Sequence, residues 1–283
     1  MLLLILSTFS PSCSQTRVIK SDNQLRVMKM KNGDIMELNS TEFLVKSNTW
    51  NLETTDHFKF YFDMAISDEL RNRTKEAQEL NYRELAKLMG IKNETFERIN
   101  FWLFKDKAQK IALTLVDSDA HAISTFPSVY YLPKNATGAQ EVGHVMTQKL
   151  WGFIPKTSNY SLLIDEGFNF YIDDERFYGG NLLVDARDIL IENPEFDLAG
   201  LIAANNGRKL TGVETGSHDL NESLLAGAFV KFMIMEYGID QFEKLWKLAV
   251  QHDVAALQIF EKIYGKSLVV LNEEFKAGLR QMR

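Results

Sequence analysis

Cysteine is almost absent from this sequence, and neither sign of charge dominates it. The 283 residues contain a single cysteine, Cys13, which excludes an intramolecular disulfide framework and any zinc site built from several cysteines. The formal net charge is −6 and the isoelectric point is about 5.5, which gives no electrostatic footprint for nucleic acid. We therefore expect no nucleic-acid partner, and the mild acidity chiefly favours solubility.

The apolar run at the start of the chain is too short to cross a bilayer, which takes roughly 20 apolar residues. It covers residues 2–6 and is followed by small and polar residues up to Cys13, as in a secretory signal. The context of Cys13 also resembles a bacterial lipobox, although Ser10 stands where an aliphatic residue is usual. We expect residues 1–15 to be a signal or lipoprotein signal segment of an exported protein, in the cell envelope or secreted. Membrane contact is expected only through a lipid anchor at Cys13, and a plain secretory signal is the alternative.

The remaining composition, with 45% hydrophobic and 25% charged residues, is that of an ordinary globular protein. Between residues 16 and 52 the pattern is strand-like. Residues 25–30 alternate between apolar and polar, residues 31–34 form a strong turn signal, and residues 35–38 continue the pattern. This pattern predicts a small β element ahead of the main domain.

The main domain, residues 53–283, changes from strands to helices near Pro133. Apolar residues at helical spacing predict a helix from about 67 to 89, and Gly90 ends it. Strands followed by helices indicate an α+β architecture. The predicted strands cover residues 57–62, 99–104, 111–116 and 128–132, and the later helices cover 138–150, 161–175, 183–193, 220–236, 239–250, 254–262 and 268–282.

Three polar side chains share one predicted helix, within residues 140–144. Positions i and i+4 lie on one face of a helix, so Gln140 and His144 project together with Glu141 beside them. Two metal-binding histidines at this spacing, with an intervening Glu that activates a metal-bound water, are the pattern of a zinc hydrolase. One helix cannot surround a tetrahedral ion, so another element must supply a further ligand. Glu166, on the next predicted helix, fits that role.

Residues 140–144, followed by the sequence Asp-Glu-Gly at 165–167, resemble the gluzincin pattern of the peptidase MA clan. In that family His-Glu-x-x-His precedes, by about twenty residues, a ligand Glu within an Asn/Asp-Glu-Gly sequence. Residues 226–232 also resemble the family's later helix, and the likeness covers roughly residues 56–265. The resemblance implies a two-lobed catalytic domain, with a β-rich lobe over about 53–135 and a helical lobe over about 136–283.

The resemblance also implies roles for single residues. Glu141 matches the general base, His144 and Glu166 match zinc ligands, and Gln140 stands in place of the first histidine. A glutamine carbonyl is a neutral oxygen donor and suits zinc less well than imidazole, so zinc is expected to be weakly bound or absent. Many family members place an oxyanion-binding tyrosine just before a small-residue triplet in the later helix, where this chain has Leu224. Loss of one oxyanion donor typically costs about 10²–10³ in rate.

The same residues have alternative structural roles. Thr137 and Gln140 fit a capping box, with Thr137 as the N-cap and Gln140 at the third helical position. Glu166 would then be an N-terminal carboxylate stabilised by the helix dipole. His144 would be a half-buried histidine that donates to a neighbouring carbonyl. The acidic run at residues 173–175 is expected to be a solvated helix end.

Three functional hypotheses follow. The first is an exported gluzincin-like protein, catalytically impaired or inactive, which keeps its cleft for a peptide or protein ligand or its fold as a scaffold. The second is an active zinc peptidase with Glu141 as general base and an unusual metal site. The third is a structural cell-envelope protein whose N-terminal β element mediates contacts. The residues at positions 140 and 224 favour the first hypothesis.

Overall fold

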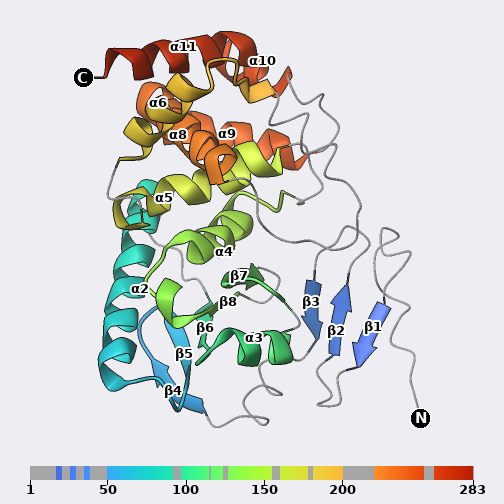
Figure 1. Ribbon diagram of the computed structural model, residues 1–283. Helices are drawn as coiled ribbons and strands as arrows, with labels where there is room; N and C mark the ends of the chain where they lie inside the picture. Colours follow the sequence, from blue (N-terminus) through green and yellow to red (C-terminus); the bar gives the residue numbers. More distant parts are fainter. Residues whose placement is uncertain are drawn as a thin grey trace.

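The computed structural model describes most of the main domain and short strands ahead of it (Figure 1). The expected signal segment, Cys13 and the turn at 31–34 lie outside the described residues. Among the residues that the structure describes, no helix has the length and apolar character needed to span a membrane. The described residues are 17–20, 26–29, 35–38, 50–91, 97–114, 116–123, 127–154, 160–177, 181–199, 220–251 and 258–282.

A five-stranded sheet of order β4-β5-β6-β8-β7 forms the centre of the main domain. Its middle strands β5, β6 and β8 run parallel, whereas β4 and β7 pair antiparallel with their neighbours at the two edges. The strands are β4 (Trp50–Thr54), β5 (Phe58–Asp63), β6 (Ile99–Leu103), β7 (Ala120–Ile123) and β8 (Ser128–Tyr131).

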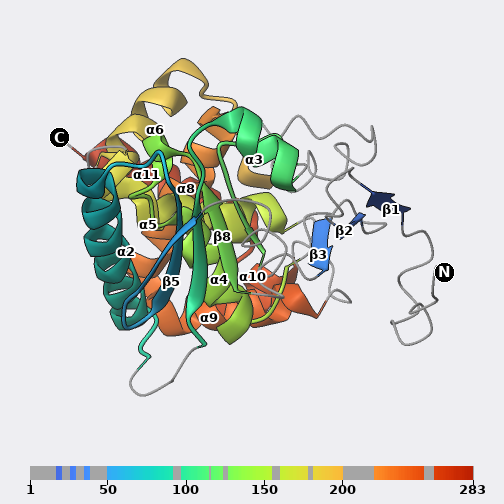
Figure 2. The same ribbon diagram turned by 90° about the horizontal axis from the view of Figure 1, so that it is seen from below.

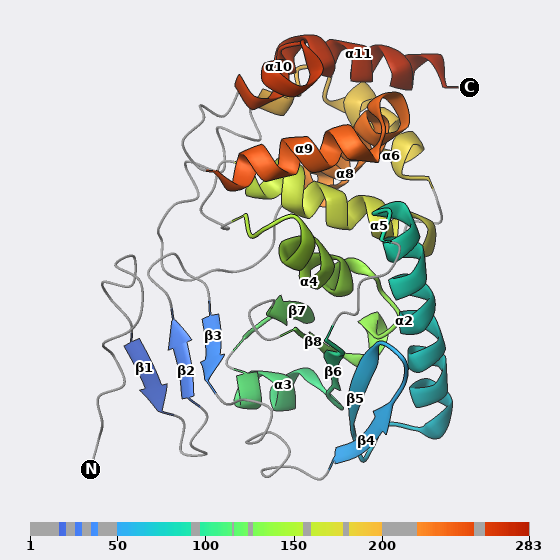
Figure 3. The same cartoon turned by 180° about the vertical axis from the view of Figure 1, so that it is seen from behind.

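Helices make up most of the other described residues of the main domain, so the α+β class is confirmed. The helices that follow the last strand stack in successive layers over one face of the sheet, with the last two helices farthest from it (Figures 1 and 3). The helices are α2 (Asp68–Leu88), α3 (Lys107–Thr114), the short η1 (Pro133–Asn135), α4 (Gln140–Leu150), the π-helical η2 (Ser161–Glu166), α5 (Gly167–Phe177), α6 (Leu182–Glu192), α8 (Leu220–Tyr237), α9 (Ile239–Val250), α10 (Gln258–Tyr264) and α11 (Leu268–Gln281).

Side chains cover both faces of the sheet, as expected for strands that run parallel. Phe60 and Phe101 belong to the large core shared with α2, α4 and the later helices. Tyr61 and Trp102, one residue along each strand, stack with ring centroids 3.8 Å apart in a smaller core on the other face. Leu113 brings α3 into this second core, on the side of the sheet seen from below in Figure 2.

Three short strands precede the main domain. β1 (Arg17–Lys20), β2 (Arg26–Lys29) and β3 (Ile35–Leu38) form an antiparallel sheet in that order. The strands predicted at 25–30 and 35–38 are therefore confirmed. β4 spans the expected boundary at residues 52 and 53, and its pairing with β5 places it in the main sheet.

The strand predicted at 111–116 is wrong, because residues Lys107–Thr114 form α3. Its apolar run is too short for periodicity to distinguish a strand from a helix. Local capping decides: the backbone N–H of Gln109 donates to Oδ1 of Asp106 at 2.8 Å, which satisfies a donor at the start of the helix. The two remaining strands of the sheet are β4 and β7, which the sequence pattern did not predict.

The other predicted helices are confirmed to within a few residues. The helix predicted at 67–89 is α2, and Gly90 follows it with a φ of 68°, the left-handed conformation that glycine adopts readily. The region predicted as one helix at 161–175 is helical throughout, with a π-helical turn, η2, before α5. Part of the helix predicted at 254–262 lies outside the described residues, and α10 covers Gln258–Tyr264.

Candidate functional site

The helix that carries the sequence motif, α4, begins at Gln140, and its N-cap Ala139 makes no side-chain capping bond. The expected capping box is therefore wrong, because Gln140 is the first helical residue rather than the third and Thr137 lies outside the cap. A distant residue caps the helix instead: the backbone N–H of Ala139 donates to Oδ1 of Asp173 at 2.6 Å. Asp173 is only 5% exposed, so the expected solvated end at 173–175 is wrong for this residue.

Tyr131, the last residue of β8, also contacts the start of α4. Its buried hydroxyl donates to the carbonyl of Gly138 at 3.1 Å. The hydroxyl oxygen of Tyr131 also accepts hydrogen bonds from the backbone N–H groups of Glu141 and Val142. The Tyr131 hydroxyl and the Asp173 carboxylate thus satisfy backbone donors that the first turn of any helix leaves without partners.

Two buried amides of α2 hold the turn that leads into α4. The side chain of Gln78 donates to the carbonyls of Ala136 and Gly138, at 2.9 and 2.8 Å. The side chain of Asn81 donates to the carbonyl of Thr137 at 3.1 Å. Because these hydrogen bonds satisfy buried carbonyls of the turn, α2 fixes where the motif helix begins.

The structure brings part of the predicted site together. His144 lies on α4 and Glu166 ends η2, and each keeps a small exposed area, 9% and 8% respectively. Glu141 is 8% exposed on the same helix, and Gln140 is half-buried at its start. All four residues thus occupy the first turns of α4 or the end of η2, at the edge of the protein interior.

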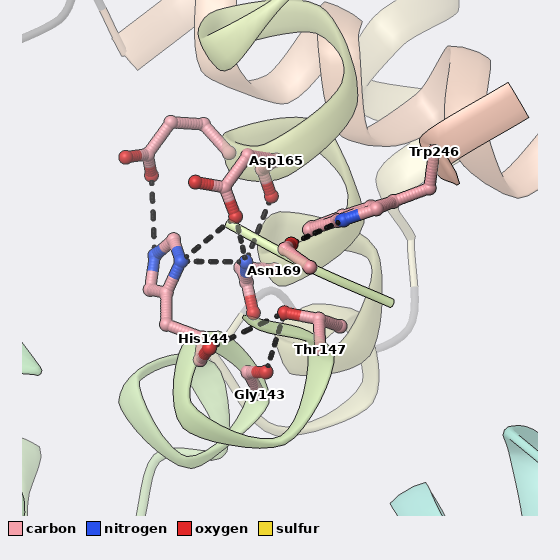
Figure 4. Close-up of polar contacts among 8 residues, drawn as sticks. Gly143, His144, Thr147, Asp165, Asn169 and Trp246 are labelled. Atoms are coloured by element: carbon pink, nitrogen blue, oxygen red, sulfur yellow. Dashed lines mark hydrogen bonds and ion pairs between the residues drawn. The ribbon is translucent and has the colours of Figure 1, made fainter. Parts of the chain in front are cut away.

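Asp165 of η2 and Asn169 of α5 both contact the ring of His144 (Figure 4). Its Nδ1 atom lies 3.0 Å from Oδ1 of Asp165 and 2.9 Å from the side-chain nitrogen of Asn169. A carboxylate has no proton to donate, so Nδ1 carries the proton and donates it to Asp165. Asn169 in turn donates to the backbone carbonyl of Asp165 at 2.8 Å. The imidazole is therefore held by a buried carboxylate. The alternative structural role, a histidine that donates to a neighbouring carbonyl, is wrong.

The other ring nitrogen of His144 faces Glu166. The distance from Nε2 to Oε2 of Glu166 is 3.6 Å. Two ligand atoms on one tetrahedral zinc lie about 3.4 Å apart when each is about 2.1 Å from the metal. The pair is therefore spaced as two zinc ligands would be, and Asp165 supplies the carboxylate that commonly orients a metal-binding histidine.

The same arrangement also stabilises a protonated histidine. Burial alone would lower the pKa of His144, but the Asp165 and Glu166 carboxylates outweigh it and raise the pKa well above its ordinary value. A proton on Nε2 can thus balance the charge of Glu166 in the way that a metal ion would.

Two glycines allow these elements to approach closely. A Cβ atom on Gly143 would lie 2.2 Å from Cδ1 of Ile172 and 2.3 Å from Oδ1 of Asn169, so a larger residue would force these side chains of α5 to move. A Cβ atom on Gly167 would lie 2.9 Å from the carbonyl oxygen of Ala226 on α8. The glycine of the Asp-Glu-Gly sequence therefore sets the distance between the end of η2 and α8.

Leu224 lies on α8, where the family resemblance implies an oxyanion donor. It is 7% exposed and belongs to the large apolar core. Its hydrocarbon side chain packs against other apolar residues and has no hydrogen to donate to an oxyanion. The structure thus assigns Leu224 a packing role.

Lys110 is a charged residue near the motif that the sequence pattern did not single out. It is fully buried, and its Nζ donates to the carbonyl and hydroxyl of Ser118, at 2.9 and 3.2 Å. Burial lowers the pKa of Lys110 to about 8, and the nearby charge of Glu141 opposes that shift. α3 therefore contributes a buried cation to the surroundings of Glu141.

The residues present fit a zinc ion only in part. His144 and Glu166 supply two suitable donors with the right separation, and Gln140 could add only a neutral carbonyl oxygen. Within the described residues, no three side chains of His, Cys, Asp or Glu come together as a metal site. A bound zinc would polarise a peptide carbonyl and activate water, but the donor set here is weaker than three charged or imidazole ligands.

Sequence reasoning missed several residues that shape this site. Asn169 carries a usable signal, because it lies four residues after Asp165 and so shares its helical face. Tyr131, Gln78 and Asp173 carry none, since their contacts with α4 join parts of the chain far apart in sequence. Comparison with known proteins adds no further residues: neither a protein-family profile nor any curated protein sequence matches this chain.

Proposed function

We propose that this chain is an exported metallopeptidase-like protein of the gluzincin type with little or no catalysis, which binds a peptide or protein segment beside α4. The observation that carries this proposal is the pairing of His144 and Glu166, with 3.6 Å between Nε2 and Oε2, beside a glutamine at position 140. The pair retains the ligand spacing of a zinc site, whereas Gln140 lacks the imidazole that would complete it. Leu224 removes a second part of the expected catalytic machinery.

The arrangement of the sheet and helices supports the proposal that the α+β domain is a two-lobed, gluzincin-like domain. Its strands lie within about residues 53–135, apart from the first residues of β4, and the layered helices follow from α4 onward (Figure 1). The motif helix stands at the junction, directly after β8 and η1. A site placed between a sheet and a helical layer is a usual position for a ligand.

The edge strand β7 supports a peptide as the ligand. It pairs on one side with β8, and among the described strands none pairs with its other side. β7 also packs against α4, so an extended segment added to this edge would run beside Glu141 and His144. Strand addition supplies main-chain hydrogen bonds without requiring a particular sequence.

Cleavage and binding of casein peptides test the proposal together. We expect fluorescein-labelled casein peptides to bind the full chain saturably, with no more cleavage than the Glu141→Gln variant shows, even with added Zn²⁺. Ala122→Pro, which removes an amide donor from β7, should weaken binding while thermal unfolding shows that the fold persists. Zinc-dependent cleavage that Glu141→Gln abolishes would overturn the non-catalytic proposal, and unchanged binding by Ala122→Pro would remove β7 as the binding edge.

An active zinc peptidase is the second candidate, favoured by the orientation of His144 by Asp165 at 3.0 Å. A carboxylate that accepts from the second ring nitrogen is common behind a metal-binding histidine. The cleavage experiment separates the two candidates. Export depends on residues 1–15, and mass spectrometry of the mature N-terminus in the native host tests it: a diacylated Cys13 supports the lipid anchor, and cleavage elsewhere supports a plain signal.

A further inference from the structure

A cavity of about 450 Å³ opens at the C-terminal end of α2, where strands β5 and β6 begin. Its wall contains Tyr82 and Ala86 of α2, Ile91 after the helix, and His57 just before β5. The motif helix, by contrast, follows the carboxyl end of β8, which runs parallel to β5 and β6. The cavity therefore lies at the opposite ends of these parallel strands from the motif helix. Its volume is within the usual range for a small-molecule site.

The floor of this cavity is aromatic and rigid. The rings of His57 and Tyr82 stack with their centroids 3.9 Å apart and an interplanar angle of 19°. Glu79 fixes His57 twice, through its backbone N–H at 3.0 Å and its Nδ1 at 2.7 Å. Burial opposes ionisation of Glu79, but the hydrogen bonds from His57 outweigh it and hold the pKa of this carboxyl below its usual range. Glu79 therefore accepts from Nδ1, and Nε2 is the ring nitrogen that a ligand can meet.

Two cations stand on the cavity wall. Arg83 and Lys87 are exposed, line the cavity, and lie four residues apart on one face of α2. Like charges at this spacing destabilise a helix slightly. Among the described residues, neither side chain forms an ion pair or hydrogen bond with an acid. The helix dipole accounts for a cation such as Lys87 in the last turn, but Arg83 lies before that turn.

We propose that this cavity binds a small organic anion. Its carboxylate or phosphate group lies between Arg83 and Lys87, and its apolar body lies against Tyr82, Ala86 and Ile91. The guanidinium and ammonium groups supply charge-assisted hydrogen bonds to the anionic group. The apolar wall gains from covering the body of the ligand, which a bare inorganic ion does not have. This site is independent of the function proposed for α4.

Isothermal titration of the full chain with four probes tests the proposal. Phenyl phosphate and benzoate carry both parts of the ligand, inorganic phosphate carries only the charge, and benzamide only the ring. We expect phenyl phosphate, benzoate or both to bind, and the stronger of the two identifies the anionic group. Inorganic phosphate and benzamide should bind at least about tenfold more weakly. Failure of both aromatic anions to bind, or equal binding of inorganic phosphate, would overturn the proposal.

Variants on α2 locate the binding site. Arg83→Gln and Lys87→Gln should each weaken binding of the preferred probe about fivefold, because each removes one charged donor. Arg73→Gln is the matched control, since Arg73 is an exposed arginine on the same helix outside the cavity, and it should leave affinity unchanged. All three positions are exposed, and circular dichroism checks that each variant keeps the fold. A loss of affinity in Arg73→Gln equal to that in Arg83→Gln would show nonspecific attraction and contradict the assignment.

Discussion

Oδ1 of Asp165 accepts the Nδ1 proton of His144 at 3.0 Å, which turns the other ring nitrogen toward Glu166. Two consecutive residues, Asp165 and Glu166, thus contact the two nitrogens of one imidazole. They do so at the end of a π-helical turn. Such turns are rare in proteins overall, and those that occur are often at functional sites. His144 and Glu166 thus have the spacing of two zinc ligands, and under the proposed function a third ligand would have to come from position 140.

Gln140→His should supply the missing ligand. We expect zinc affinity to rise by roughly tenfold or more, because imidazole is a better zinc ligand than an amide oxygen and lies one helical turn from His144. Titration with Zn²⁺ against a competing chelator measures the change. Lys149→His adds an exposed histidine to the same helix and should change nothing. Equal affinity in Gln140→His and the unaltered chain would show that positions 140, 144 and 166 do not converge.

Removal of the Asp173 carboxylate should destabilise the start of α4. Asp173→Ala leaves the Ala139 N–H without its acceptor, and loss of such a cap costs about 1–2 kcal/mol. Urea unfolding measures the difference. Asp240→Ala, at an exposed position in the first turn of α9, should cost less than about 0.5 kcal/mol. The capping role of Asp173 is wrong if the two variants prove equally stable.

The buried amide of Gln78 should matter more than any exposed polar group on α2. Gln78→Leu removes the donor to two buried carbonyls, at Ala136 and Gly138, and should cost about 2–4 kcal/mol in the free energy of unfolding. Glu84→Leu makes a similar change at an exposed position of the same helix and should stay within about 0.5 kcal/mol. Comparable losses in both variants would contradict the role of α2 in fixing α4.

Lys110 should make stability rise with pH above neutrality. Its pKa is about 8 in the folded chain against 10.5 for the ordinary side chain, so between these values the unfolded chain binds more protons. The unfavourable burial of the charged form is therefore relieved as the pH rises from about 8 toward 10.5. Unfolding at pH 7 and pH 10 should show a gain on the order of 2–3 kcal/mol that Lys110→Met lacks. An equal pH dependence in the variant would show that Lys110 is not buried as a cation.

The sequence predicted the long helices well because periodicity extends over many residues. The helix expected at 239–250 is α9 with the same bounds, and its buried residues Phe242, Leu245, Trp246 and Ala249 follow helical spacing. β4 and β7 were missed because each is short and lies at a sheet edge, where one side is not covered and the apolar pattern weakens.

Helix starts were harder to predict, and two similar sequences show why. The segment Asp-Lys-Ala-Gln at 106–109 caps α3, whereas Thr-Gly-Ala-Gln at 137–140 has the same spacing and caps nothing. At α4 the donors are satisfied by Tyr131 and Asp173, which tertiary packing brings to the helix. Local patterns predict local caps, but they do not predict which distant side chain replaces them.

The candidate site could be predicted in part. The spacing of Glu141, His144 and Glu166 located the motif, and the structure places His144 beside Glu166. Asp165 and Asn169 appear only when the helical segments are packed together, because their contacts with His144 join η2 and α5 to α4. Short-range spacing finds residues on one element, whereas the contacts between elements require the fold.

The zinc content of the purified full chain at neutral pH tests the central claim most directly. Inductively coupled plasma mass spectrometry after dialysis counts the metal retained per chain, in the unaltered protein and in Glu166→Ala. We predict far less than stoichiometric zinc in both proteins, because His144 and Glu166 alone make a weak site and a proton on His144 competes for it. Stoichiometric zinc in the unaltered chain, lost in Glu166→Ala, would contradict the account.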